Sequence, residues 1–424
     1  MDLAEDSFLT DEFLHQLINV GQVDILVGLP THNNAKTVGS IVNTIQSGIL
    51  RGFPRERAAI INVDEGSRDG TPALVTGVSI DDARPANNLH ALRTLHSIST
   101  NYASSPAGGV AFRSILAAAE LLQAKACVVL SPESENIEPD WLSKLLRPVY
   151  QDGFDLVAPT YRRHKFEGLL ITNLIYPMTR ALYGLRIREA YAPEFAFSGK
   201  LGTQFLAENN WTDGTGGAGV ELRFSLAAIA GKYRICQSFL GEKIHIERKA
   251  ADLVPALRQT VGALFSALEP DFPAWSVVAG SQPVPTTGTD QEVLLDPLRV
   301  NRKRLREMFS SGVAELESVF QSILSPSTLA ELQRIAQLGE EDLHYSAELW
   351  VRTVYEFAAS YRKSVISRDH IIQALAPLFR GRACTFVLEN RNASPDEVEK
   401  NIEELCLEFE RLKPYLLQLW TSRE

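Results

Sequence analysis

Short apolar segments alternate with amphipathic segments through the first half of the chain. Continuous apolar runs predict buried strands at 23–29, 58–63, 126–130 and 155–159. Apolar residues at helical spacing predict helices at 4–20, 35–50, 112–123 and 139–150, and a further element begins at 71–78. Continuous apolar strands alternating with amphipathic helices are typical of a mostly parallel sheet with helices on both faces. The pattern therefore predicts an α/β domain.

The pattern changes in the second half of the chain. Residues 270–291 are rich in Pro, Gly, Ser and Thr, which is typical of a linker or of a segment that wraps around a domain. Beyond residue 292 the pattern is helical, with breaks expected near Pro326, Gly381 and Pro395. We therefore expect a helical lead-in, an α/β domain, a linker and an α-helical C-terminal region, with the boundaries 1–21, 22–268, 269–291 and 292–424. The apolar periodicity around Leu349 and Leu412 fits packing within the chain and a homodimer contact equally well.

Composition narrows the class of protein. The chain has 424 residues, of which 45% are hydrophobic and 22% charged, enough for two or three globular domains. Its net charge of −10 argues against nucleic acid and anionic membranes as partners. The longest apolar segment, 168–184, is interrupted by Asn173 and Arg180, so we expect no membrane span. Four scattered cysteines without zinc spacing, and an acidic N-terminus unlike a signal peptide, indicate a cytoplasmic protein.

Polar residues follow three of the predicted strands. Ligands of such sheets collect beyond the carboxyl ends of the strands, which here read Leu-Pro-Thr-His-Asn-Asn at 29–34, Val-Asp-Glu-Gly-Ser-Arg-Asp-Gly-Thr at 63–71 and Leu-Ser-Pro-Glu-Ser at 130–134. Asp64 could accept hydrogen bonds from a base or a ribose, and Gly66 would allow the backbone to approach a ligand closely. The same run could equally be a loop whose side chains bond to their own backbone.

Taken together, these motifs resemble the GT-A glycosyltransferases of the group that includes the glucosyl-phosphoglycerate, glucosylglycerate and mannosylglycerate synthases. The family's Pro-x-x-Asn-Glu loop corresponds to residues 30–34, and its more specific Val-Asp-Asp-Gly-Ser-x-Asp-Gly-Thr run to residues 63–71. The resemblance covers roughly residues 22–265, and the C-terminal helical region is similar to the extension of the mannosylglycerate synthases. It implies a GT-A fold and a nucleotide-sugar site formed by Pro30, Thr31, Asn33, Asp64, Gly66, Ser131 and Pro132.

Later segments extend the resemblance toward an acceptor site. Gly-Val-Glu at 219–221 is similar to the family segment whose carboxylate lies in the acceptor pocket, which implies a catalytic role for Glu221. The resemblance also implies acceptor contacts from Arg162, Arg163, Ser198, Gly199 and Gly219. From the residues alone, Glu221 could instead be a carboxylate stabilised by a helix N-terminus. The basic run at 161–165 could likewise be a solvated face, and the glycines at 214–219 a mobile loop.

The metal motif departs from the family pattern. The family's Asp-x-Asp is replaced by Ser131-Pro132-Glu133, and the strand at 240–245 is similar to one that ends in a metal-binding histidine. The resemblance therefore implies a divalent cation, Mg²⁺ or Mn²⁺, held by Glu133 and His245, although a lone histidine is more often a surface or core residue. Residues 106–109 lack the family's lysine, and Asn34 replaces a glutamate.

Two functions remain open at this point. One is transfer of a hexose, with retention, from a nucleotide diphosphate sugar to a small hydroxy acid such as glycerate or phosphoglycerate. The other is a degenerate GT-A protein that binds a nucleotide sugar without catalysis, in a regulatory or binding role. The two differ in whether the altered motif at Ser131, Pro132 and Glu133 still supports metal-assisted chemistry.

Overall fold

The structure is a computed structural model, and two compact units can be distinguished in it by their internal contacts. It describes residues 9–77, 95–101 (backbone only), 109–134, 136–208, 219–243, 253–288, 298 and 300–422. The sheet unit comprises residues 1–161, 192–248 and 284–292, and the helical unit comprises 162–191, 249–283 and 293–424. The helical unit thus takes 162–191 and all of 249–283 from the stretch that the sequence pattern assigned to the α/β domain and its linker.

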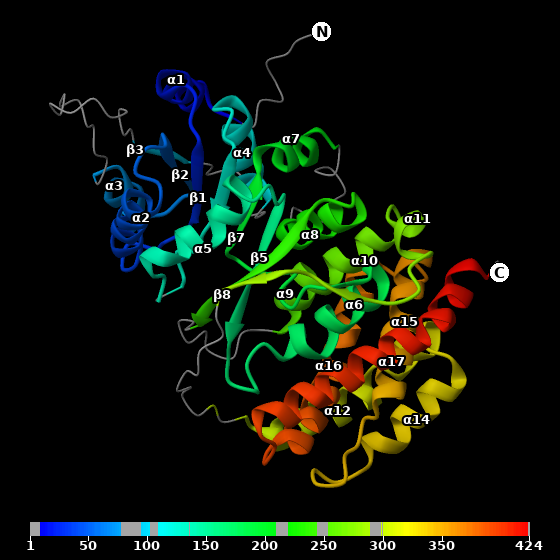
Figure 1. Ribbon diagram of the computed structural model, residues 1–424. Coiled ribbons are helices and arrows are strands. Elements are labelled where there is room, and N and C mark those ends of the chain that lie inside the picture. Colours follow the sequence, from blue (N-terminus) through cyan, green and yellow to red (C-terminus); the bar gives the residue numbers. More distant parts are fainter. Residues whose placement is uncertain are drawn as a thin grey trace, which may run out of the picture. The chain divides into compact units, whose positions relative to one another are not determined.

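An eight-stranded sheet forms the centre of the sheet unit (Figure 1). Its strands, in spatial order, are β10 (Thr286–Thr287), β8 (Ile235–Glu242), β5 (Leu156–Arg162), β7 (Phe195–Ser198), β4 (Ala126–Val129), β1 (Ile25–Thr31), β2 (Ala58–Asp64) and β3 (Leu95–Asn101). Strands β3, β2, β1 and β4 run parallel, whereas β7 runs antiparallel to both β4 and β5. The prediction of a mostly parallel α/β sheet is confirmed.

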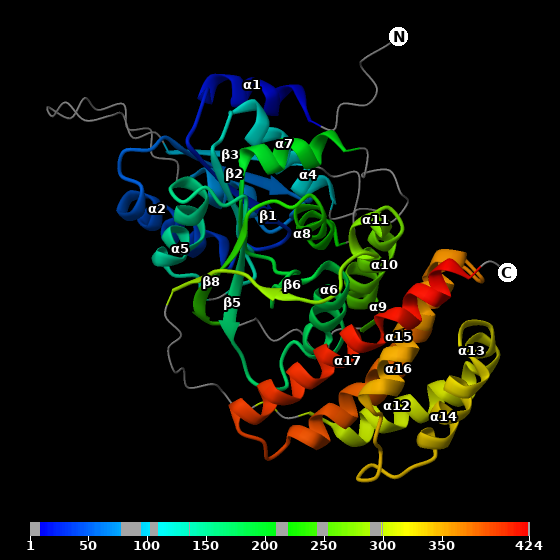
Figure 2. The same ribbon diagram turned by 45° about the vertical axis from the view of Figure 1, so that its right-hand side comes forward.

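Helices cover both faces of the sheet (Figure 2). Ile25, Val27 and Leu29 of β1 pack into one apolar core with helices α2 (Val38–Gly52) and α5 (Pro139–Tyr150). On the other face, Gly28 lies so close to Ile115 of α4 (Gly109–Leu121) that an added Cβ would stand 2.7 Å from it. Adjacent residues of a strand point to opposite faces. This near-continuous apolar strand is therefore buried on both faces, as the sequence predicted. The remaining helices of the unit are α1 (Asp11–Val20), α3 (Thr71–Thr76), α7 (Gly199–Ala207) and α8 (Val220–Ala230).

The helical unit contains the predicted C-terminal helices, α12 (Arg302–Glu315), α13 (Glu317–Ile323), α14 (Pro326–Ala336), α15 (Ala347–Lys363), α16 (Arg368–Asn390) and α17 (Pro395–Thr421). It also contains η1 (Ile171–Ile175), α6 (Tyr176–Tyr183), α9 (Leu253–Leu257), η2 (Arg258–Gly262), α10 (Ala263–Leu268) and α11 (Phe272–Trp275). The breaks expected near Pro326 and Pro395 are confirmed, because a helix begins at each of these prolines.

The break expected near Gly381 was wrong, because α16 continues through it. Its glycine serves close packing instead. A Cβ at Gly381 would stand 2.6 Å from the ring of Phe309 on α12, and a Cβ at Gly312 of α12 would stand 2.2 Å from Pro377 on α16. The two glycines therefore let these helices approach each other more closely than larger residues would allow.

The Pro- and Gly-rich segment is a wrapping segment as far as the structure describes it. It forms α11, then β9 (Gln282–Pro283), which pairs with β6 (Leu185–Arg186) of the helical unit, and then β10, which pairs with β8 of the sheet unit. The backbone is therefore used for strand pairing along part of 270–288. Residues 289–291 lie outside the described part.

One described helix, α16, is long and apolar enough to cross a membrane by length and composition. Of its apolar window, 83% is buried inside the structure, as is usual for a core helix. The apolar segment at 168–184 forms one short helix over 169–183 that contains a π-helical turn, η1, and its polar residues Asn173 and Arg180 are fully buried. The four cysteines are buried and free.

Candidate functional site

The three polar strand ends lie at one edge of the sheet. Because β1 and β2 pair in register with Thr31 opposite Asp64, and β1 pairs with β4, the segments that follow these strands begin side by side. We call them the first loop (32–37), the second loop (65–70) and the third loop (130–138). The predicted donor-site residues Pro30, Thr31, Asn33, Asp64, Gly66, Ser131 and Pro132 are therefore brought together at this edge.

Asp64 is fully buried at the end of β2. Its Oδ1 accepts hydrogen bonds from the hydroxyls of Thr31 (2.9 Å) and Ser67 (2.5 Å), and its Oδ2 accepts one from the backbone N–H of Ser67 (2.8 Å). A carboxylate that accepts several hydrogen bonds fixes the groups that donate them. Asp64 thus organises the second loop, as the loop interpretation of this run required.

Side chains join the first loop to the second. The N–H of Asn33 donates to Ser67 Oγ (2.7 Å), and the N–H of Arg68 donates to Asn33 Oδ1 (3.0 Å). The N–H of Ala35 donates to Asp69 Oδ2 at 2.9 Å. Asn33 has a φ of 54°, a left-handed conformation that asparagine tolerates better than most residues.

The glycines of the second loop meet a related requirement. Gly66 and Gly70 have φ values of 79° and 86°, in the region where a side chain would be strained. The second loop therefore makes a tight turn at these two glycines. Together with the hydrogen bonds between the loops, it makes a fixed polar surface rather than two independent loops.

The third loop carries the altered metal motif. The carbonyl of Pro132 accepts a hydrogen bond from Thr37 Oγ1 (2.7 Å), which ties this loop to the first one. The N–H of Glu133 donates to Ser131 Oγ at 3.2 Å, and the Glu133 side chain is half-buried. Ser131 therefore holds the backbone of the turn on which Glu133 stands.

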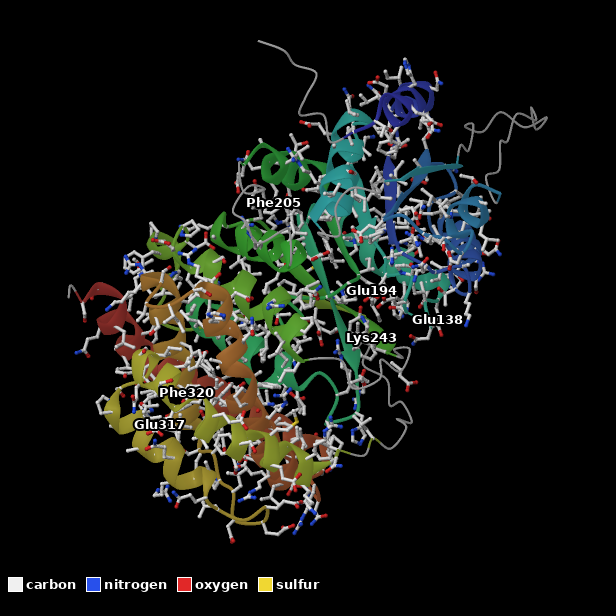
Figure 3. The ribbon with its side chains drawn as sticks, turned by 180° about the vertical axis from the view of Figure 1, so that it is seen from behind. Glu138, Glu194, Phe205, Lys243, Glu317 and Phe320 are labelled. Atoms are coloured by element: carbon white, nitrogen blue, oxygen red, sulfur yellow. The ribbon has the colours of Figure 1, made fainter. Side chains whose placement is uncertain are left out.

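A buried ion pair, not anticipated from the sequence, lies at the same edge (Figure 3). Glu194 and Lys243 have no side-chain exposure, and Lys243 Nζ lies 2.5 Å from Glu194 Oε2. The hydroxyl of Tyr161 donates to Glu194 Oε2 at 2.6 Å, and that of Ser134 donates to Oε1. Burial opposes ionisation of Glu194, but Lys243 and these hydroxyls outweigh it and lower the pKa of the carboxyl. Lys243 stands in the segment 240–245 that was singled out from the sequence, but the sequence did not relate it to Glu194.

Ser198 and Gly199 are not brought to this edge, which corrects the expectation that they contact an acceptor there. Because β7 runs antiparallel, Ser198 pairs with Ala126 at the amino end of β4, whereas Ser131 follows its carboxyl end. Ser198 instead caps α7 by accepting the N–H of Leu201 (3.2 Å). A Cβ at Gly199 would stand 1.9 Å from the carbonyl of Ala124, so this glycine allows a close backbone contact.

Glu221 lies in the first turn of α8, directly after Gly219, which has a φ of 71°. Burial raises the pKa of Glu221 to about 7, its own backbone N–H opposes this shift, and the nearby Glu65 carboxylate adds to it. Burial also raises the pKa of Glu65, against the influence of His32. The structure thus brings two carboxyls with raised pKa values near each other, which is typical of sites that handle protons.

Aromatic packing holds α8 in place. Phe224, one turn after Glu221, contacts the rings of Phe112, Phe197 and Phe205 at centroid distances of 5.0 to 5.2 Å. Edge-to-face contacts of this kind fix relative orientation as well as burying apolar area. The helix that carries Glu221 is therefore anchored to α4, β7 and α7.

The basic run at 161–165 is used within the units. Arg162 and Arg163 belong to the helical unit, where Arg163 forms an ion pair with the buried Glu189 (2.9 Å). Lys165 donates to the backbone carbonyls of Arg391 (3.1 Å) and Ala393 (2.9 Å). The run is therefore not simply a solvated face, and acceptor contacts by Arg162 and Arg163 remain a prediction.

Of the two predicted metal ligands, Glu133 lies within the described residues and His245 does not. No group of three or more His, Cys, Asp or Glu side chains suited to a metal occurs among the described residues. His245 lies outside them, so its pairing with Glu133 stays a prediction. Half-buried Glu133 supplies one oxygen donor of the kind that Mg²⁺ and Mn²⁺ accept, and such ions complete their shells with water and phosphate oxygens.

Comparison with known proteins gave structural neighbours only. No protein-family model and no curated protein sequence matches the chain. Among solved structures, the chain is similar to glucosyl-3-phosphoglycerate synthase from Mycobacterium tuberculosis in complex with Mg²⁺ and UDP, at 22% identity, with 60% of this chain and 83% of that one covered and a TM-score of 0.44. It is also similar to mannosyl-3-phosphoglycerate synthase from Rubrobacter xylanophilus, at 19% identity, with 59% and 75% covered and a TM-score of 0.43.

Proposed function

We propose that the sheet unit binds a nucleotide diphosphate sugar at the carboxyl edge of its sheet and transfers the hexose to a small hydroxy acid, with retention. The observation that carries the proposal is the set of three strand-end loops, joined to one another by hydrogen bonds, with Asp64 at the end of β2 and Glu133 on the third loop. Glu221 adds a carboxyl on α8. Fixed polar groups at this edge suit ligand binding in a parallel sheet. The substrate class comes from the resemblance of residues 30–34 and 63–71 to the glycosyltransferase motifs.

The donor would bind along the first and second loops. Thr31, Asn33 and Gly66 present backbone and side-chain groups to the nucleoside, together with Pro30 and Asp64. Asp64 already accepts three hydrogen bonds. It would therefore act by orienting the loop, by contacting the nucleoside after a partner is exchanged, or by both.

The diphosphate would lie over the third loop, beside Ser131, Pro132 and Glu133. A divalent cation bound there would neutralise the charge that develops on the leaving diphosphate. Glu133, with His245, would hold that ion. Ser131 cannot supply a second carboxylate, so water and the diphosphate would complete the coordination.

Glu221 would act on the acceptor. At the pKa of about 7 that burial produces, its carboxyl exists in both protonation states near neutral pH. In its ionised form it can accept a hydrogen bond from the acceptor hydroxyl, which Gly219 would also contact. Arg162 and Arg163 would bind the acidic group of the acceptor, which in the case of Arg163 requires release from Glu189.

The direct experiment is a calorimetric titration with UDP- and GDP-sugars, with and without Mn²⁺, followed by a screen for nucleotide release. We expect binding that strengthens with the metal, and loss of that gain in Glu133→Ala. Glu138→Ala is the matched control, since Glu138 lies exposed on the same loop. Equal binding with and without the metal in the parent would contradict the metal role of Glu133.

The second candidate is a nucleotide-sugar-binding protein without catalysis. Ser131 at the place of the family's first aspartate favours it, because one carboxylate holds a divalent ion less tightly than two. The two candidates separate in Ser131→Asp. Metal-dependent turnover in the parent would exclude the binding protein, and nucleotide binding without turnover even in Ser131→Asp would exclude the enzyme.

Two sequence expectations belong with this proposal. A cytoplasmic location fits nucleotide sugars as substrates. A homodimer formed by the C-terminal helices would be detected by light scattering at micromolar concentration, and a monomer there would remove it.

A further inference from the structure

We propose that Glu194 and Lys243 are positioning residues for Glu133: their buried ion pair braces the third loop and sets where that carboxylate stands. The inference deepens the proposed function and rests on it. It concerns residues that the motif resemblance does not assign to any role.

The ion pair gathers groups from four segments of the sheet unit. Glu194 lies just before β7, Lys243 just after β8, Tyr161 near the end of β5 and Ser134 on the third loop. All three partners of Glu194 contact its two carboxylate oxygens, at 2.5 Å for Lys243 and 2.6 Å for Tyr161, with a short hydrogen bond from Ser134. The pair therefore holds the third loop from inside the edge of the sheet.

Burying this pair needs an explanation beyond stability. Desolvation penalises both buried charges, and well-packed apolar residues of similar volume often give an equally stable fold. Buried ion pairs can instead specify one arrangement over others. Here the arrangement specified is the position of Ser134, one residue after the proposed metal ligand.

Other contacts make the brace continuous with the rest of the loop. Thr37 holds the carbonyl of Pro132, and Asn136 Nδ2 donates to the carbonyl of Glu242 at 2.6 Å. Lys243 Nζ also lies 4.5 Å from the centroid of the Tyr161 ring, a favourable cation–π distance. The backbone of the loop is thus held on both sides of Glu133, at Pro132 and at Ser134, which limits how far the Glu133 carboxylate can move.

The test removes the charges but keeps the volume, in the double variant Glu194→Gln/Lys243→Met. Two measurements are made on the full chain: amide hydrogen exchange at 131–138, and the gain in UDP and GDP affinity that Mn²⁺ produces. We expect faster exchange confined to this loop, unchanged metal-free nucleotide affinity, and a metal-dependent gain reduced by about tenfold or more, as for residues that orient metal ligands. A merely structural pair would lower the unfolding midpoint without this separation of metal-dependent and metal-free binding.

A milder variant guards against a double variant that does not fold. Ser134→Ala removes only the contact between the loop and the pair, and leaves Glu194, Lys243 and Tyr161 in place. We expect the same changes at smaller size, with Ser134→Thr, which keeps the hydroxyl, restoring the metal-dependent gain. The inference would be overturned if folded Ser134→Ala and the folded double variant both showed parent-like exchange and a parent-like gain in affinity with Mn²⁺.

The outcome also distinguishes the inference from the proposed function. A parent protein that binds neither UDP nor GDP, with or without Mn²⁺, refutes the proposed function and with it the role toward Glu133. A parent that gains affinity with Mn²⁺, beside variants that gain as much, refutes the positioning role alone.

Discussion

The two units bury their charges in different ways. In the sheet unit, both members of the Glu194–Lys243 pair are completely buried, and their contacts converge from several strand ends on one loop. In the helical unit, Arg180 of α6 is completely buried, but its partners Glu403 and Glu410 on α17 keep side-chain exposures of 44% and 18%. The first arrangement fixes a point at the edge of a sheet, and the second joins two helices.

Lys413 shows the same helix-joining use of charge. Its ammonium donates to the backbone carbonyls of Ala181, Leu182, Trp275 and Val278, at distances between 2.6 and 3.3 Å. Ala181 and Leu182 lie in the last turn of α6, and Trp275 ends α11. Carbonyls at a helix end have no partner within the helix, so one cation from α17 satisfies two such ends.

These two uses of buried charge predict different effects of mutation. Charges that join helices should affect the stability of the helical unit and leave ligand binding alone. Charges at the sheet edge should affect binding more than stability.

Arg180→Ala should have the largest effect. It removes a bidentate ion pair with Glu403, at 2.5 and 2.7 Å, and the bond to Glu410 at 2.8 Å, and it leaves a cavity. We expect the free energy of unfolding to fall by about 3 kcal/mol, the lower end for breaking a buried pair, because Glu403 can turn toward water. Urea denaturation measures the loss.

The control for Arg180 is Arg411→Ala. Arg411 is 57% exposed and forms only surface ion pairs, so its loss should change the free energy of unfolding by less than about 0.5 kcal/mol. Equal effects from the two variants would show that the buried pair is not what joins α6 to α17.

Lys413→Met should follow in size. The thioether keeps the length of the side chain but leaves four carbonyls without their donor. The substitution also removes a buried ammonium, whose pKa burial lowers to about 8. Unsatisfied buried carbonyls outweigh the relief of desolvation, and we expect a loss of about 2 kcal/mol. Thermal or urea unfolding checks this, and nucleotide affinity should stay as in the parent. A weakened nucleotide affinity would blur the proposed division between the units.

Asp64→Ala tests the sheet edge. If Asp64 is the main nucleoside contact, nucleotide affinity should fall about thirtyfold, or about 2 kcal/mol. Because Asp64 also holds Ser67, Asp64→Asn is the sharper companion: it keeps an acceptor for the two hydroxyls but opposes the N–H of Ser67. A parent-like affinity in Asp64→Ala, measured by calorimetry, would place the pocket elsewhere.

The sequence predicted the parallel core of the fold well. Strands β2 and β4 and helix α5 fall within a residue of their expected bounds, because buried strands and an amphipathic helix give unambiguous periodicities. The three strand-end loops were also predicted, since parallel strands bring their carboxyl ends to one edge. The hydrogen bonds from the N–H of Ser67 to Asp64 and from the N–H of Thr71 to Asp69 confirm that side chains of the run at 63–71 bond to their own backbone.

The direction of β7 in the sheet could not be predicted from the sequence. A four-residue apolar strand reads the same whether it runs parallel or antiparallel, and this choice decides which end reaches the ligand edge. Because β7 runs antiparallel to β4, its amino end and Glu194 lie at the ligand edge. Ser198 and Gly199, which the sequence placed at the site, lie at the opposite end of the strand. The helix break predicted near Gly381 was wrong for a similar reason. The glycine is needed because Phe309 of another helix packs against it, and the sequence does not show that contact.

The smallest predicted effect concerns the protonation of Glu221. Its folded pKa of about 7 lies above its ordinary value of 4.5, so the folded state binds this proton more tightly than the unfolded state. The resulting stability is fully present below pH 4.5 and is lost as the pH rises through 7. Relative to Glu221→Gln, which does not titrate, the parent should lose about 1 kcal/mol over this range, allowing for partial exposure to water.

Hexose transfer should change in the opposite sense, rising toward pH 7 in the parent as the carboxylate forms, and remaining low and flat in the variant. Unfolding midpoints and transfer rates measured on the same buffers from pH 5 to 8 check both trends. Parallel stability curves for parent and variant would contradict the raised pKa, whereas a sloping stability difference with an unchanged transfer profile would leave the pKa standing and remove Glu221 from the reaction.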